Sequence, residues 1–148
     1  MPGEKITTIS PITGAAIAVR QGVAEDAFDN ILATSTAAFS AFRHTHPLAR
    51  RQEIVGRALE ILASKQDALG KDITCQMGRP IAYTPKEVAT AVKRGEYLLK
   101  VSADALKDTP GEQEVGFRRW IRKEPLGPVL VVFAWNVCPP PPERTMAA

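Results

Sequence analysis

The chain has 148 residues, of which 45% are hydrophobic and 24% are charged, and its formal net charge is +3. This length and balance predict one globular domain with a core, and the even spread of Lys and Arg argues against a nucleic-acid surface. The two cysteines do not make a disulfide framework, and neither a membrane span nor a secretory leader is visible, so we expect a cytoplasmic protein with no membrane partner.

The chain begins with the pattern of a β-hairpin. Residues 6–10 and 16–19 have the composition of short strands, and residues 11–14 between them form a turn signal. Pro11 has a preset φ that suits such a turn, and Gly14 can adopt a positive φ. We expect this hairpin to have a structural role.

A layer of amphipathic helices is predicted next, because apolar residues recur at a spacing of three and four. The expected helices cover residues 24–42, 47–69, 71–77 and 84–106. Pro47 fits the first turn of the second helix, and Gly78 ends the third. We interpret the layer as packing surface rather than as a binding groove.

The last of these helices has a clear start signal. Thr84 is expected to cap the helix, Pro85 to occupy its first position and Glu87 to complete a capping box. Gly95 lies on the apolar face of the same helix, where glycine costs about 1 kcal/mol relative to alanine. We therefore expect another backbone to approach the helix closely at Gly95.

Three residues could in principle bind a metal or react as a thiol, but we interpret each of them as structural. His44 and His46 have a spacing seen in metal ligands, but no Cys or carboxylate cluster lies near them in the sequence. We interpret both as turn residues and predict no metal site. Cys75 is expected to be a small buried apolar residue on a helix.

Residues 115–123 alternate in polarity, which predicts a strand with one more polar face. Its cations, Arg118, Arg119, Arg122 and Lys123, have two interpretations. They could bind an anionic ligand, or they could protect the edge of a sheet against aggregation, and the second interpretation is favoured.

The most informative stretch comes near the end of the sequence. Residues 129–133 are uniformly apolar and rich in β-branched side chains, which is typical of a strand buried on both faces in a parallel sheet. Ligands of such sheets bind beyond the carboxyl ends of the strands. Residues 134–136 occupy that position, so we expect chemistry to begin there.

Three motifs in this sequence resemble the NAD(P)-dependent aldehyde dehydrogenase family. The first is S-P-I-T-G at residues 10–14, and the second is Q-M-G-R-P at residues 76–80. The third is E-P-L-G-P-V at residues 124–129, followed by F-A-W-N at residues 133–136. Their order and spacing match the family, and the general look is that of enzymes acting on semialdehydes or aromatic aldehydes.

The resemblance implies an incomplete α/β fold of the aldehyde dehydrogenase type. Its expected parts are the hairpin, the helical layer, an oligomerisation-type strand at residues 115–123 and the first strand of a Rossmann-like parallel sheet. Residues 1–136 would form this partial N-terminal domain. Residues 137–148 are expected to be a divergent Pro-rich tail, because four consecutive prolines cannot continue the helix that follows in the family. A shifted reading frame, a mis-called splice site and a genuine truncation remain open as its origin.

The resemblance also implies site residues for the oxidation of a small aldehyde to a carboxylic acid with NAD or NADP. Asn136 matches the residue whose amide donates to the oxyanion. Val132, Phe133, Ala134 and Trp135 match positions that line the ribose and nicotinamide end of the cofactor. Without the resemblance, Asn136 would be interpreted as a strand-end cap or a turn residue.

The family's nucleophilic Cys and general-base Glu lie downstream of the W-N pair, and Cys138 comes too early to be that nucleophile. We therefore expect no activity from this chain alone. One alternative is a non-catalytic fragment that associates with or modulates a full-length relative through residues 115–123, or forms a homo-oligomer. Another is an unrelated helical interaction module. Since one strand cannot complete a sheet, we also expect exposed apolar surface, marginal stability and a tendency to associate.

Overall fold

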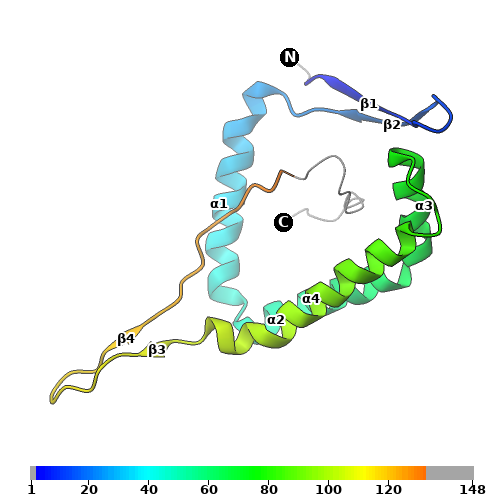
Figure 1. Cartoon of the computed structure of the whole chain (residues 1–148). Helices are drawn as coiled ribbons and strands as arrows, with labels where there is room; N and C mark the ends of the chain where they lie inside the picture. Colours follow the sequence, from blue (N-terminus) through cyan, green and yellow to red (C-terminus); the bar gives the residue numbers. More distant parts are fainter. Residues whose placement is uncertain (1–2, 133–148) are drawn as a thin grey trace.

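The computed structural model of the chain describes residues 3–132. Its helices and strands form an open arrangement rather than a closed ball (Figure 1). The elements in chain order are β1 (Lys5–Ile9), β2 (Ala16–Gln21), η1 (Glu25–Ala27), α1 (Phe28–Thr45), α2 (Leu48–Ser64), α3 (Gln66–Met77), α4 (Thr84–Leu106), β3 (Thr109–Pro110) and β4 (Trp120–Ile121). No helix among the described residues is both long enough and apolar enough to cross a bilayer.

The N-terminal hairpin is confirmed. β1 and β2 pair antiparallel, with Lys5 opposite Gln21, and the register shifts between Thr8 and Ile9. Gly14 adopts the expected positive φ of 70° in the turn. The second strand continues two residues beyond the predicted end at residue 19.

The four predicted helices are also confirmed, with different boundaries, but they do not form one packed layer: α2 and α3 pack against α4, whereas the main contact of α1 among the described residues is with η1. The first predicted helix begins as the 3-10 turn η1 and then continues as α1 to Thr45. The predicted junction after residue 69 is wrong, because α2 ends at Ser64 and Lys65 leaves the helical conformation before α3 begins. Lysine is not a helix breaker, so the local sequence does not mark this junction. Pro47 precedes the first helical residue of α2 instead of lying in its first turn.

The buried core lies where α4 packs against α2 and α3. Ile73 of α3 and Val88 and Val92 of α4 are its buried hydrophobic residues within the described range. Gly70 is buried beside them, and a methyl group there would lie 2.8 Å from Pro85 Cγ. The start of α4 therefore fits directly against the glycine of α3.

The predicted capping box at the start of α4 is wrong. Tyr83 holds the cap position, and no side chain caps the helix. Thr84 is completely buried, and its hydroxyl lies 3.0 Å from the hydroxyl of Thr74 in α3. Glu87 forms an ion pair with Arg79 at 3.0 Å. The side chains of Thr84 and Glu87, which a capping box would use, therefore interact with residues outside α4 instead.

Gly95 does mark a close approach, but the neighbour is a side chain. A methyl group at Gly95 would overlap the methyl groups of Leu59 in α2. The expectation that another backbone would approach here is therefore corrected: glycine makes room for a leucine between two packed helices.

The predicted strand over residues 115–123 is mostly wrong. Only Trp120–Ile121 forms a strand, and it pairs with Thr109–Pro110, within a stretch predicted to be a loop. Gly116 has a φ of 84°, and an isolated bridge joins Glu114 to Phe117. The alternating stretch thus contains the tip of a short hairpin, which projects away from the helices (Figure 1).

Residues 129–132 do not form the predicted buried strand. They carry no strand hydrogen bonding to any other described residue, and all four side chains are exposed, Leu130 by 89%. A strand of this kind needs neighbours on both edges, and residues 3–132 supply none.

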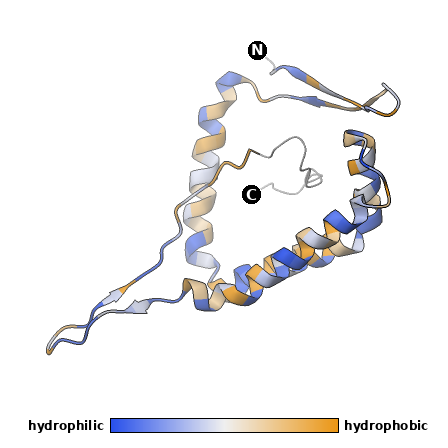
Figure 2. Cartoon of the chain, viewed as in Figure 1, coloured by the Kyte–Doolittle hydropathy of each residue, from blue (hydrophilic) through white to orange (hydrophobic). Residues whose placement is uncertain are grey.

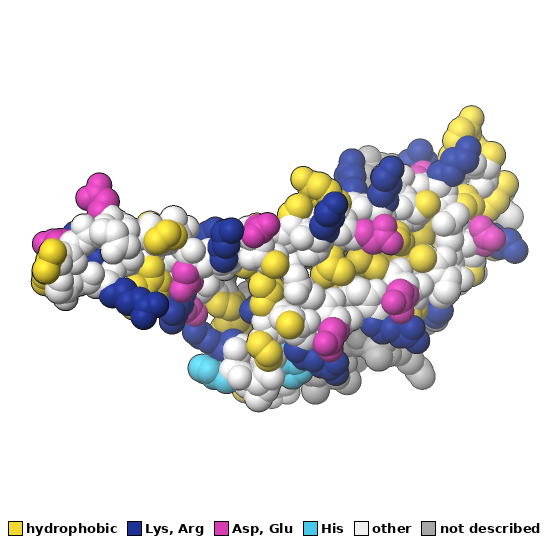
Figure 3. All heavy atoms as spheres, turned by 90° about the horizontal axis from the view of Figure 1, so that it is seen from below, with side chains coloured by type: hydrophobic (Ala, Val, Ile, Leu, Met, Phe, Trp, Pro, Cys, Tyr) yellow, Lys and Arg dark blue, Asp and Glu magenta, His cyan; other side chains and the backbone are white. Residues whose placement is uncertain are grey.

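Much apolar surface is exposed, as the sequence predicts. Figure 2 shows hydrophobic residues along the helices, and Figure 3 shows hydrophobic side chains at the surface between charged ones. The accessible surface is 12271 Å², whereas a compact monomer of 16.1 kDa exposes about 7,400 Å². The open arrangement therefore leaves a large area without an internal partner.

Candidate functional site

Two of the three motifs meet in space. The turn at residues 10–14 lies against the end of α3, where a methyl group at Gly78 would come within 3.2 Å of Pro11 Cγ. Gly78 has a φ of 73°, which lets the chain turn out of α3 at this contact. Ser10 is buried there, and its backbone N–H donates to the carbonyl of Ala15. This contact joins the hairpin to the helices, and its polar groups are already engaged: the Ser10 hydroxyl accepts from the Ile12 N–H, and Arg79 pairs with Glu87.

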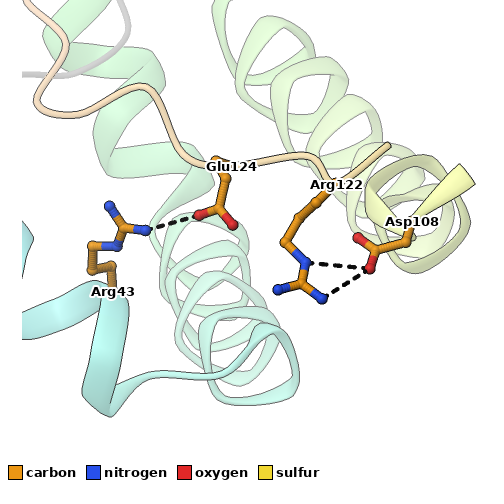
Figure 4. Close-up of polar contacts among 4 residues, drawn as sticks. All are labelled: Arg43, Asp108, Arg122 and Glu124. Carbon is orange, nitrogen blue, oxygen red and sulfur yellow. Dashed lines mark hydrogen bonds and ion pairs between the residues drawn. The ribbon is translucent and has the colours of Figure 1, made fainter. Parts of the chain in front are cut away.

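The third motif begins at an electrostatic attachment point (Figure 4). Arg43, in the last turn of α1, donates to the Glu124 carboxylate at 2.8 Å. Arg122 donates to Asp108 through Nε and Nη2 at 3.3 Å each, and Lys123 donates to the carbonyl of Ala105 at 2.5 Å. Residues 122–124 are thus held to the C-terminal ends of both α1 and α4.

Arg43 helps to hold residues 122–124 in place, and the sequence did not identify it in advance. A basic residue in a last helical turn is favoured by the helix dipole, so its position has a local signal. Its partner lies 81 residues away, and no sequence spacing identifies a pair at that distance.

The predicted chemical residues lie at and beyond the end of this segment. Val132 is 85% exposed, and its segment has no neighbouring strand among residues 3–132. Asn136 and the predicted cofactor residues Phe133, Ala134 and Trp135 lie outside the described residues. The Pro-rich tail and Cys138 lie outside them as well.

The cations of the projecting hairpin are engaged within the chain. Arg119 pairs with Glu114 and Arg122 with Asp108. Arg118 and Arg122 both lie over the Trp120 ring, 5.7 Å from its centre. A half-open hollow of about 360 Å³ lies beside these side chains. Arg119 and Arg122 are neutralised by these ion pairs. The hollow therefore offers little of the positive charge that would attract an anion.

Cys75 and the two histidines show no reactive arrangement. Cys75 is exposed, which corrects the prediction that it is buried; Ile73, two residues earlier on α3, faces the core instead. His46 stacks on Phe42 with 4.3 Å between ring centres, and its Nδ1 lies 2.7 Å from the Thr45 hydroxyl. Within residues 3–132, no three His, Cys, Asp or Glu side chains gather as metal ligands.

The described residues do not by themselves fit a nicotinamide cofactor. Val132 is the one predicted cofactor residue among them, and its exposed side chain is not part of any enclosed surface formed by residues 3–132. The hollow at the hairpin is lined by residues 108–122 and includes none of the predicted cofactor positions. A nucleotide site needs a concave surface with converging polar groups, which the segment around Val132 does not present.

Comparison with known proteins gives a consistent result. The model of the aldehyde dehydrogenase family matches residues 1–141. Succinate-semialdehyde dehydrogenase 1 from Mycobacterium ulcerans, whose name specifies NADP(+), is 29% identical over 133 residues, which are 88% of this chain and 29% of that relative. The chain therefore spans less than a third of the length of this relative.

Solved structures share the arrangement of the helices and strands. A putative aldehyde dehydrogenase from Burkholderia cenocepacia has a TM-score of 0.74 at 21% identity, over 83% of this chain and 25% of that one. An aldehyde dehydrogenase from Bartonella henselae has a TM-score of 0.66 at 22% identity, over 78% and 24% of the two chains. The fold is thus an incomplete α/β arrangement of the same type as the front quarter of these enzymes.

Proposed function

Because the chain belongs to the aldehyde dehydrogenase family, we propose that its function derives from the NAD(P)-dependent oxidation of an aldehyde and that residues 1–136 are one part of such a site. The family match over residues 1–141 is the observation that carries this proposal. The Mycobacterium ulcerans relative is named for succinate semialdehyde and NADP(+), so this pair is the first substrate and cofactor to test. The two cysteines fit a reducing, cytoplasmic location.

Asn136 is the residue of this chain with a direct chemical role in the proposal. Attack on an aldehyde carbonyl places negative charge on its oxygen, and a fixed donor aimed at that oxygen lowers the barrier. A side-chain amide suits this role because it donates a hydrogen bond and does not ionise. The residues before it, from Val132 to Trp135, would form one wall of the cofactor site.

In the family that this chain belongs to, the nucleophilic Cys and the general-base Glu lie downstream of the W-N pair, beyond the matching positions of this sequence. Cys75 is exposed on α3, and Cys138 directly precedes the prolines. We therefore propose that this chain alone does not oxidise aldehydes.

The test is a turnover assay of the purified chain with succinate semialdehyde and NADP, in which the fluorescence of the reduced cofactor is followed. We expect no turnover, both for the unmodified chain and for Asn136→Ala. The Mycobacterium ulcerans enzyme serves as the positive control. A rate that the unmodified chain shows and Asn136→Ala loses would contradict the proposed inactivity.

A second candidate function is non-catalytic association with a full-length relative through the β3–β4 hairpin. The hairpin projects from the helices, and its Phe117 and Ile121 side chains are exposed. The unpaired edges of such a short sheet are open to another strand. Co-purification with a full-length relative that Phe117→Asp abolishes would support this candidate. Ala33→Asp, which adds the same charge on α1, is the matched control.

A further inference from the structure

Three hydroxyl side chains directly precede a proline in this sequence, and they belong to Ser10, Thr84 and Thr109. Two of them are closed off by the fold, since Ser10 is 3% exposed and Thr84 is completely buried. Their hydroxyls are also engaged, with the N–H of Ile12 and the hydroxyl of Thr74 respectively. Thr109 is exposed, and its hydroxyl bonds to no residue between 3 and 132. The fold therefore leaves one of the three Ser/Thr-Pro pairs open to an enzyme that modifies hydroxyls.

Thr109 lies on a short extended segment at the edge of a sheet. β3 consists of Thr109 and Pro110, follows the end of α4 closely and pairs with β4. A residue before proline is confined to extended conformations, and a sheet this short opens locally at little cost. Many proteins that recognise peptides bind them in extended form. The backbone of the Thr109–Pro110 pair therefore already has a conformation suited to recognition.

The side chain of Thr109 belongs to a face of the hairpin that is rich in cations, called here the Thr109 face. Residues opposite one another in a pair of strands share a face, and so do residues two apart along a strand. Thr109 therefore shares its face with Ile121, its partner in β4. The residue before α4 meets β3 is also extended, with a ψ of 153° at Lys107. The alternation thus places three cations on the Thr109 face: Lys107, Arg119 and Lys123.

Contacts within the hairpin agree with this division into two faces. A methyl group at Gly111, two residues after Thr109, would lie 3.0 Å from Arg119 Cβ, so these residues share the Thr109 face. Arg122 bonds instead to Asp108, and by the same alternation this pair belongs to the other face. The carboxylate next to Thr109 in the sequence is therefore held on the opposite side of the hairpin from the Thr109 hydroxyl.

Two cations of the Thr109 face are only weakly engaged. Lys107 pairs with Asp104 at 3.1 Å, and both side chains are largely exposed. Lys123 donates to the Ala105 carbonyl at the end of α4 and has no carboxylate partner among residues 3–132. Exposed ion pairs contribute little, whereas a phosphate group brings a charge of about −1.5 to −2 and three acceptor oxygens. A phosphate on Thr109 would therefore attract both lysines.

We propose that Thr109 is a phosphorylation site and that Lys107 and Lys123 bind the phosphate. A proline-directed protein kinase transfers the γ-phosphoryl group of ATP to the hydroxyl. A bond forms between Thr109 Oγ1 and the γ-phosphorus while the bond from that phosphorus to the β,γ-bridging oxygen breaks. ADP leaves, and the hydroxyl proton passes to the catalytic base of the kinase. The phosphate then ties the end of α4 to β4. This inference goes beyond aldehyde oxidation and uses none of the residues proposed for it.

The site is tested by incubating the complete 148-residue chain with MgATP and a proline-directed kinase, followed by mass spectrometry of its peptides. We expect phosphate on Thr109 and on neither Ser10 nor Thr84. Thr109→Val is expected to abolish the modification and Thr109→Ser to retain it. Unfolded peptides covering residues 5–16, 79–90 and 104–115 are the matched controls. All three are expected to accept phosphate, because only the fold protects the first two.

The role of the two lysines is tested by phosphorus NMR of the phosphorylated chain during a pH titration. The second pKa of phosphothreonine lies near 6, and neighbouring cations favour the dianion and so lower this pKa. We expect the double variant Lys107→Gln/Lys123→Gln to raise the pKa of the phosphate by about 0.5. Lys100→Gln, which removes the same charge from an exposed position of α4, is expected to leave it unchanged. Circular dichroism verifies that each variant keeps its helices.

Four results would overturn the inference. The first is a chain in which Thr109 stays unmodified while the peptide of residues 104–115 accepts phosphate. The second is modification of Ser10 or Thr84 in the folded chain as fast as that of Thr109. The third is a phosphate pKa that the double variant leaves unchanged. The fourth is inorganic phosphate bound by the unmodified chain and lost in the double variant, which would assign the Thr109 face to a free anion instead.

Discussion

Two helical glycines of this chain have opposite surroundings. A methyl group at Gly56 of α2 would meet only Leu99 Cδ2, at an ordinary distance of 3.6 Å. A methyl group at Gly70 of α3 would lie 2.8 Å from Pro85 Cγ and 2.9 Å from Pro85 N. The same substitution therefore tests two different physical effects.

Gly70→Ala is expected to destabilise the chain, and Gly56→Ala to stabilise it. Alanine gains about 1 kcal/mol over glycine within a helix, but overpacking costs about 1–3 kcal/mol, and only Gly70 is overpacked. Urea denaturation followed by circular dichroism measures both free energies of unfolding. Equal stabilisation by the two substitutions would mean that α3 and α4 do not pack as closely as Gly70 and Pro85 indicate.

At the residue scale, sequence patterns predict backbone requirements better than side-chain partners. The positive φ of Gly14 and the helix end at Gly78 follow from glycine's own conformational freedom, and both are confirmed. The capping role of Thr84 was wrong because Thr74, ten residues away on another helix, is its actual partner. Packing between helices decides which partner Thr84 has, and a local sequence pattern carries no information about that packing.

At the scale of elements, the attachment of residues 122–124 is open to a direct test. Arg43→Gln removes the ion pair with Glu124, and we expect tryptic cleavage after Arg122 and Lys123 to become about two- to fivefold faster, since an exposed pair contributes up to about 1 kcal/mol. The cleaved sequence itself is unchanged in this variant. Mass spectrometry of the fragments gives the rates.

Arg57→Gln is the matched control for this experiment. It removes an ion pair with Glu60 that lies wholly within α2, so cleavage after residue 123 should not change. The effect of Arg43→Gln should also shrink in 1 M salt, where the screening length is only about 3 Å. An equal response to both variants would show that residues 122–124 are not held through Arg43.

The helices were predictable from the sequence and the C-terminal strands were not. Helical periodicity is local, so the four helices were found and only their junctions moved, as at Lys65. Strand formation depends on a neighbour that periodicity does not reveal. The apolar stretch 129–132 has the composition of a buried strand but no partner among the described residues. The chemical residues that follow it remain predictions.

At the scale of the whole molecule, the large exposed surface has a thermodynamic consequence. With 12271 Å² accessible in the folded chain, unfolding exposes about 70% of the new surface that a compact protein of this mass would expose. The urea m-value scales with that area, so we expect it to be about 30% below that of a compact protein of equal length. Denaturant titration measures the m-value, and an m-value typical of a compact domain would show that the free chain closes up in solution.

The buried core has a consequence for biosynthesis. Ile73, Val88 and Val92 belong to α3 and α4, and α2 immediately precedes α3 in the sequence. Contacts between neighbouring segments form quickly, and N-terminal units can fold while synthesis continues. Once residue 106 has emerged from the ribosome, every side chain of this core is present. The helical unit can therefore assemble co-translationally, with its apolar outer faces exposed to chaperones while the rest of the chain is made.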